Sequence, residues 1–233
     1  MTGSHPVHRR ARPCDDDLVR TLALVALIGC GGHSATTACQ PSILYLDRAG
    51  GMYDHGATDS AGANRSVLLD GPRQLPGWPR DDAQWAEVVS CIAAALAPFP
   101  IDVTEDDPGA SPHVELVFTT TYWAEPSATT MIVPDGCGDD HQLEFVFADA
   151  LPPTPTPVCQ IAIVGYAEMT ADLTLDDNCQ DLVNLAQDCS QTRSFVDATA
   201  SCVDDFEQPA ACRCGGTTED TYQAMVAAHP ACD

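Results

Sequence analysis

Short runs of hydrophobic residues alternate with polar and proline-rich segments along this chain, and the first clear run predicts a strand. Residues 42–47 (SILYLD) place Ile43 and Tyr45 on one face of an extended chain and Leu44 and Leu46 on the other. Apolar side chains on both faces are typical of a strand that is covered on both sides. The first element is therefore expected in the interior of a sheet.

The clearest helix signal follows a long polar stretch. Asp81, with Gln84 three residues later, has the form of a capping box, and Pro98 ends the pattern. Between them, hydrophobic residues recur at spacings of three and four: Trp85, Val88, Val89, Ile92 and Leu96. This periodicity predicts a surface helix with one apolar face.

Further strands are predicted on either side of this helix. Glycine and polar residues predict a long loop over residues 48–66, followed by a short strand from Ser66 to Asp70. Beyond the helix, residues 101–105, 113–118 and 143–149 have the composition of strands. Alternation in the second of these is expected to direct one set of side chains into the core (Val114, Leu116, Phe118) and the other toward solvent (His113, Glu115).

The longest apolar run of the expected mature chain predicts a central helix. Residues 152–157 (PPTPTP) are interpreted as a linker, and residues 158–173 are apolar on nearly every side. A strand is the alternative for residues 159–164 alone, but the run is too long for one. A last surface helix is expected from near Thr217, with one face formed by Tyr222, Met225, Val226 and His229.

Length and the N-terminal residues define the expected domain organisation. The 233 residues suffice for one main core. Residues 22–32 are apolar but far too short to cross a bilayer, which indicates an export signal rather than a short buried segment. Leu27 to Cys30 resembles a bacterial lipobox, so residues 1–29 are expected to form the leader, Cys30 to be lipidated, and residues 30–41 to form a tether. We therefore expect an exported protein that is lipid-anchored to the bacterial cell envelope, at the outer membrane, or extracellular, and that meets the membrane through this lipid only.

The charge excludes one class of partner. The formal net charge is −24, and removing residues 1–29 takes away four arginines and three aspartates, which leaves −25. The chain has no lysine, and such a field repels nucleic acid because phosphate binding needs clustered cations. The acidity is consistent with a solvated surface or with attraction of cations such as calcium.

Ten cysteines beyond Cys14 and Cys30 are candidates for disulfides, as expected for an exported chain. They are Cys39, Cys91, Cys137, Cys159, Cys179, Cys189, Cys202, Cys212, Cys214 and Cys232. Their crowding near the end predicts a disulfide-rich C-terminal subdomain over residues 179–233. A zinc knuckle at Cys212 and Cys214 is disfavoured, because a one-residue spacer is shorter than such sites use.

The order of elements resembles the zincin fold, in particular that of the secreted bacterial metzincin-like metalloproteases. It is a strand, a helix, several strands, a buried helix and a disulfide-linked tail. The quoted segments that carry the resemblance are ILYLD, LAPFPIDVTE, EFVFAD and the cysteine-rich close CVDDFEQPAACRCGGTTEDTY. The resemblance implies an α+β domain over residues 42–178, with a twisted mixed sheet, one surface helix and one buried central helix, plus the disulfide-rich tail.

The zinc motif of that family, H-E-x-x-H-x-x-G-L-x-H, is degenerate here. In the register that keeps its glutamate, Glu168 and Leu175 match, Thr174 replaces the glycine, and the three ligand positions hold other residues: Ala167, Ala171 and Asp177. Alanine offers no lone pair, and without a metal the vestigial base Glu168 has no activated water to deprotonate. No zinc ligands and no cofactor are therefore expected.

Three carboxylates give the same helix a second interpretation. Glu168, Asp172 and Asp176 are four residues apart, so they would share one face if the helix continued to Asp176. They would form either a solvated stripe or a calcium site.

Together, these features predict a pseudo-metalloprotease that acts as a non-catalytic scaffold for an unidentified peptide or protein. The alternatives are an active metallopeptidase with atypical ligands and a structural envelope lipoprotein.

Overall fold

The computed structural model describes residues 40–120, 131–134, 137–138, 141–184, 193–204 and 207–231. Residues Ala38–Asp233 form one compact unit. Several sequence predictions fall outside the described residues. They concern the leader, the lipidation site Cys30, all but the last two residues of the tether, and the cysteines Cys39, Cys189 and Cys232. Among the helices described, none is long and apolar enough to cross a membrane.

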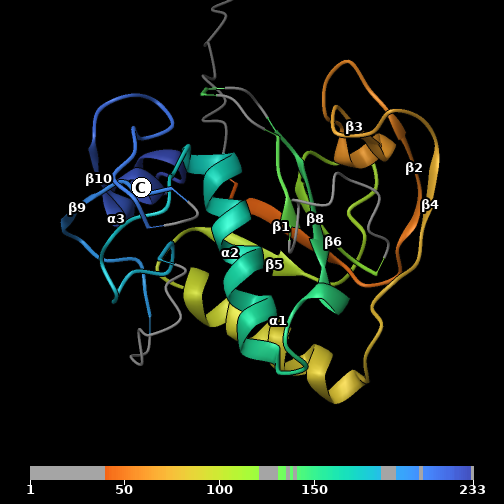
Figure 1. The fold of residues 1–233 in the computed structure, drawn as a ribbon. Coiled ribbons are helices and arrows are strands. Elements are labelled where there is room, and N and C mark those ends of the chain that lie inside the picture. Colours follow the sequence, from red (N-terminus) through yellow and green to blue (C-terminus); the bar gives the residue numbers. More distant parts are fainter. Residues whose placement is uncertain are drawn as a thin grey trace, which may run out of the picture. The chain divides into compact units, whose positions relative to one another are not determined.

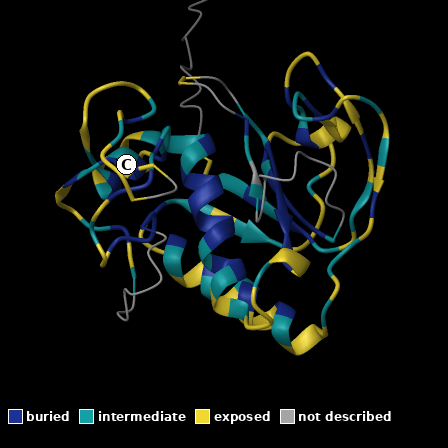
Figure 2. Ribbon diagram, in the orientation of Figure 1, coloured by how far each residue is buried: buried dark blue, intermediate teal, exposed yellow. Residues whose placement is uncertain are grey.

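The described residues form three α-helices, and the first two agree with the hydrophobic pattern. Helix α1 (Asp82–Leu96) begins as predicted, because the Asp81 side chain accepts a hydrogen bond from the Gln84 amide. Helix α2 (Pro155–Ala171) is the predicted buried helix, and Figure 2 shows its middle turns as buried. Helix α3 (Thr221–Ala228) is capped by Asp220.

A five-stranded mixed sheet has the order β5-β1-β6-β8-β7. The strands are β1 (Ser42–Asp47), β5 (Ile101–Thr104), β6 (Val114–Thr119), β8 (Leu143–Phe147) and β7 (Met131–Ile132). The first four in the order are parallel, and β7 pairs antiparallel with β8 at the edge. The predicted α+β domain is confirmed in its coarser part, since the described residues combine helices with a mixed sheet, and four of the five strands of that sheet are parallel.

The sheet is covered on both faces. Helices α1 and α2 pack on one face, where they contact Leu44, Leu116 and Val146 (Figure 1). The other face, which includes Val117 and Phe145, packs against the segment between β1 and α1. Two-sided cover explains why β6 and β8 are almost entirely buried.

That covering segment corrects two predictions. The expected loop over residues 48–66 and the expected strand Ser66–Asp70 are wrong. The segment instead forms a small three-stranded sheet and a 3-10 turn: β2 (Gly51–His55), η1 (Ala61–Ala63), β3 (Arg65–Ser66) and β4 (Arg73–Leu75). Strand β2 pairs with both neighbours, so its pairing partners lie too far along the chain for local periodicity to show them.

The predicted outward direction of His113 and Glu115 is also wrong. Both side chains are buried. The β2–β4 sheet covers the face that the alternation had assigned to solvent, and Tyr53 on β2 contacts Glu115 through a hydrogen bond of 2.7 Å.

Further boundaries differ in the second half of the chain. Helix α2 begins at Pro155, inside the predicted linker, because proline is tolerated in a helix's first turn. The 3-10 turn η2 (Ala148–Ala150) follows β8. Strands β9 (Thr199–Ser201) and β10 (Thr218–Asp220) pair antiparallel before helix α3. The helix therefore begins at Thr221 and not near Thr217, and Met225 on its predicted apolar face is fully buried.

Three disulfides join described residues: Cys91–Cys159, Cys137–Cys214 and Cys202–Cys212. The first connects α1 to α2, and the other two hold the tail. Cys179 is also disulfide-bonded. For these seven cysteines the predicted disulfide bonding is confirmed.

Candidate functional site

The degenerate motif begins on the last turn of α2 and continues beyond it. Ala167 is fully buried, and the helix ends at Ala171. Asp172 then adopts a left-handed conformation with φ 54°, and its N–H bonds to the Ala167 carbonyl. Asp177 stands at the motif's third ligand position. Its Oδ1 accepts a hydrogen bond from the amide of Ser201, the last residue of β9, at 3.0 Å.

The three carboxylates were predicted to share one helix face only if the helix continued to Asp176, but α2 ends at Ala171. Asp172 accepts a hydrogen bond from the Gly138 amide at 3.0 Å. Asp176 lies in the following segment, is buried, and forms an isolated bridge with Cys202. Glu168, Asp172 and Asp176 therefore do not share a helix face, and the geometry does not support calcium binding along such a row.

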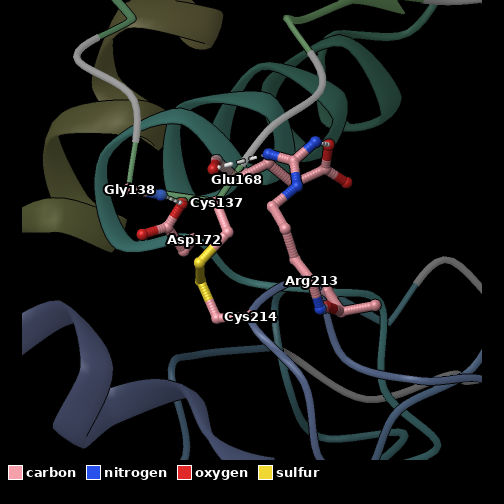
Figure 3. Close-up of a disulfide and its surroundings, with 7 residues drawn as sticks. Cys137, Gly138, Glu168, Asp172, Arg213 and Cys214 are labelled. Carbon is pink, nitrogen blue, oxygen red and sulfur yellow. Dashed lines mark hydrogen bonds and ion pairs between the residues drawn. A yellow bond between two sulfur atoms is a disulfide. The ribbon is translucent and has the colours of Figure 1, made fainter. Parts of the chain in front are cut away.

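Glu168 is partnered by an arginine from the tail. The Glu168 carboxylate lies 3.6 Å from the Arg213 guanidinium, and both side chains are largely buried, with exposed fractions of 15% and 13%. The same guanidinium donates to the Glu168 carbonyl at 2.7 Å and to the Pro134 carbonyl at 3.4 Å. Figure 3 shows the guanidinium beside the helix end. Arg213 thus joins α2 to the segment that leaves β7.

Two disulfides fix the backbone on both sides of Arg213. Cys212 is bonded to Cys202, and Cys214 to Cys137. The Arg213 amide also donates to the Thr174 hydroxyl at 2.7 Å. The spacing Cys212-Arg213-Cys214 therefore presents an arginine and is not a zinc knuckle.

The residues at the motif do not fit a zinc ion. Two groups of three candidate ligand atoms lie close together within the described ranges, Cys137–Asp172–Cys214 and Cys202–Cys212–Glu219. In each group both cysteines are bonded to another cysteine, so neither offers a thiolate. No chemical step through zinc can be derived from this arrangement.

A buried glutamate lies beneath α2 and was not identified from the sequence. Glu144 on β8 is fully buried, and its carboxyl oxygens have no hydrogen-bond partner among the described atoms. Burial, and secondarily the charge of Glu168, raises the pKa of Glu144 well above its usual value. Burial thus favours the neutral form of this carboxyl over the ionised form. In the sequence, the only indication of this buried carboxyl was a single glutamate within the apolar strand segment LEFVF.

Gly165 is required for this packing. A Cβ atom at Gly165 would overlap the Glu144 carboxyl group. We expect Gly165→Ala to lower the free energy of unfolding by about 1–3 kcal/mol through overpacking, measured by urea denaturation. Glu144→Ala in the same chain should restore part of the loss. The matched control Ala162→Gly, also buried in α2, should cost about 0.5–1 kcal/mol, and a Gly165→Ala chain as stable as the wild type would contradict the packing argument.

A second buried acidic group joins β1, β2 and β6. The Tyr53 hydroxyl lies 2.9 Å from Oδ2 of Asp47 and 2.7 Å from Oε1 of Glu115. Because a hydroxyl has one hydrogen, it donates to one carboxyl and accepts from the other, which must be protonated. Asp47 also accepts from the Ala49 and Gly50 amides, which favours its ionised form. The proton therefore resides on Glu115, whose pKa burial raises to about 8.

No family model, no curated protein and no solved structure matches this chain.

Proposed function

We propose that this chain is an exported, lipid-anchored, non-catalytic protein with a metzincin-like frame that binds an extended peptide or protein segment. One observation carries the proposal: the Glu168 carboxylate is paired with Arg213 at the motif position where an active enzyme would use its glutamate as a base. A carboxylate paired with a guanidinium is a weak base. The alanines at positions 167 and 171 add no metal ligand.

The order of elements supports the frame. Strand β1, helix α1, strands β5 to β8, the buried helix α2 and a disulfide-linked tail follow one another in the order on which the resemblance rests. The start of the degenerate motif, Ala167 to Ala171, lies in the last turn of the buried helix, which supports this frame.

Strand β7 supports the binding role. It is the edge strand of the sheet, and no further strand pairs with its outer side within the described residues. An unpaired edge offers backbone N–H and C=O groups to an extended segment. Arg213 bonds the Pro134 carbonyl just beyond β7, which holds this edge against α2. The strongly negative chain favours a basic partner.

The first test separates this proposal from an active metallopeptidase. The full chain, purified without chelators, is analysed by plasma mass spectrometry and assayed against denatured casein. We expect less than 0.1 zinc per chain and no hydrolysis. Near-stoichiometric zinc, together with hydrolysis that Glu168→Gln abolishes, would overturn the proposal.

The second test concerns the edge. A displayed library of random seven-residue peptides is selected on the full chain, and the selected peptides are titrated against Met131→Pro and Ile132→Pro. In an edge strand one of two adjacent N–H groups points outward, and only that position tolerates proline. The variant that keeps the wild-type circular dichroism spectrum should weaken peptide binding about tenfold or more, whereas the control Glu168→Gln should not. If no peptide is selected, or if the folded proline variant binds unchanged, the binding role is wrong.

A further inference from the structure

The disulfide Cys137–Cys214 is the most exposed of the three whose two cysteines both lie in the described residues. Both of its cysteines are exposed. Each of the other two bonds includes a buried cysteine, Cys159 in one and both Cys202 and Cys212 in the other. Exchange requires a thiolate to reach a sulfur atom, so exposed disulfides are the labile ones. A thiol in solution therefore reaches Cys137–Cys214 before the other two bonds.

A carboxylate lies beside this bond. An oxygen of Asp172 and the sulfur atoms of Cys137 and Cys214 all lie within 4.8 Å of one another (Figure 3). The Gly138 amide donates to the same side chain at 3.0 Å, which holds it in place. The carboxylate repels an attacking thiolate and attracts a positive group next to that thiolate. The bond is therefore expected to react faster with a thiol that carries a nearby cation than with one that carries a nearby anion.

The bond also connects two distant parts of the chain. It joins the segment that follows β7 to the C-terminal tail, across a sequence separation of 77 residues. Arg213 of the tail reaches the Pro134 carbonyl of the same segment at 3.4 Å, which is long for a hydrogen bond. Cys202–Cys212 closes its own loop within the tail. Cleavage of Cys137–Cys214 is therefore expected to loosen the segment after β7 while the tail loop stays closed.

We propose that Cys137–Cys214 is an exchange site for a dithiol that carries a positive charge beside its reactive thiol, and that reduction releases the segment after β7 from the tail. One thiolate of the dithiol attacks a sulfur of the bond, and the other cysteine leaves and takes a proton. The second thiol of the reductant then attacks the mixed disulfide. Two electrons and two protons pass to the chain, which ends with two thiols, and the dithiol becomes a disulfide. The proposal is independent of peptide binding at β7.

The first test maps reduction in the folded full chain. The chain is incubated with dithiothreitol without denaturant, alkylated with N-ethylmaleimide at intervals, and digested for mass spectrometry. We expect Cys137 and Cys214 to be labelled about tenfold faster or more than Cys159, Cys202 and Cys212, because the buried bonds react only after the chain opens. Equal rates, or faster labelling of the buried cysteines, would overturn the site.

The second test measures the preference for a cation. The rate of reaction at this bond is measured with cysteamine, which carries an ammonium group, and with 2-mercaptoethanesulfonate, which carries a sulfonate. Asp172→Asn should lower the ratio of the two rates about threefold or more, because a unit charge a few ångströms away is lost. The same thiols are compared in each chain, so their intrinsic reactivities cancel. Asparagine keeps an oxygen for the Gly138 amide and tolerates the left-handed conformation of residue 172.

The matched control is Glu87→Gln, which removes one exposed carboxylate of α1. It should change the ratio less than about 1.5-fold, because solvent and salt screen a distant charge. An equal change in Glu87→Gln and Asp172→Asn would show only the field of the whole chain and would overturn the role of Asp172.

The third test measures release of the segment after β7 by hydrogen exchange. After selective reduction, the Gly138 amide should exchange about tenfold faster or more, whereas the amides of β6 should not change. The double variant Cys137→Ser and Cys214→Ser should show the same exchange without reductant. Unchanged exchange at Gly138 in both chains, or faster exchange that includes β6, would overturn the release.

Discussion

Replacing Arg213 with methionine is expected to lower the free energy of unfolding by about 3–5 kcal/mol, the range found when one partner of a buried ion pair is removed. The guanidinium contacts the Glu168 carboxylate and two backbone carbonyls, those of Glu168 and Pro134. Methionine fills similar volume but donates no hydrogen bond. The variant leaves a largely buried carboxylate without its cation. Urea denaturation followed by tryptophan fluorescence measures the effect.

The control is an exposed ion pair in the same chain. Arg48 and Asp82 lie 2.6 Å apart, with exposed side-chain fractions of 40% and 89%. Arg48→Met should cost less than about 1 kcal/mol, because solvent screens such pairs. Glu168→Gln in the Arg213→Met chain should recover part of the loss, since the unpaired charge is then absent. Equal small costs for Arg213→Met and Arg48→Met would contradict the role assigned to Arg213.

Acidification from pH 8.5 to pH 5 is expected to raise the free energy of unfolding by about 3 kcal/mol or more. Burial raises the pKa of Glu115 to about 8 and those of Asp176 and Glu219 to about 7. In the unfolded chain the pKa values of these groups are near 4. At a pH between the unfolded and the folded pKa, the folded chain binds more protons than the unfolded chain. The free energy of unfolding is therefore highest below about pH 4 to 5, and it falls as the pH rises through 7 and 8.

Thermal unfolding between pH 5 and pH 8.5 checks this dependence. Glu115→Gln should reduce it, because the glutamine amide donates to the Tyr53 hydroxyl as the protonated carboxyl does. Repeating the series at 0.5 M NaCl separates repulsion among exposed carboxylates, which salt screens, from the buried groups. A melting temperature that stays constant or rises toward pH 8.5 would contradict the assignment.

The elements that sequence analysis located are those with a strong local pattern. The capping pair Asp81 and Gln84 marks the start of α1 in the sequence, because the hydrogen bond from the Gln84 amide to the Asp81 side chain joins residues only three apart. Helix α2 was identified by an apolar run too long for a strand. Strand β1 was identified by apolar residues on both faces.

The features that sequence analysis missed depend on partners distant in the chain. Glu115 was expected outside because alternation cannot show that the β2–β4 sheet covers its face. Asp172 ends α2 in a left-handed conformation that a row of carboxylates at helical spacing did not reveal. Arg213 lies 45 residues from Glu168, and only the folded tail brings the two together.

The sequence by itself determined that the chain combines helices with a sheet, and it located the capped surface helix and the buried central helix. These depend on residue identity and on spacings of two to four residues, which the backbone geometry of strands and helices imposes. The tertiary structure alone decided which charges are buried and what partners them. Arg213 against Glu168, Tyr53 between Asp47 and Glu115, and Glu144 beneath Gly165 each join segments that only the packing of the whole chain brings into contact.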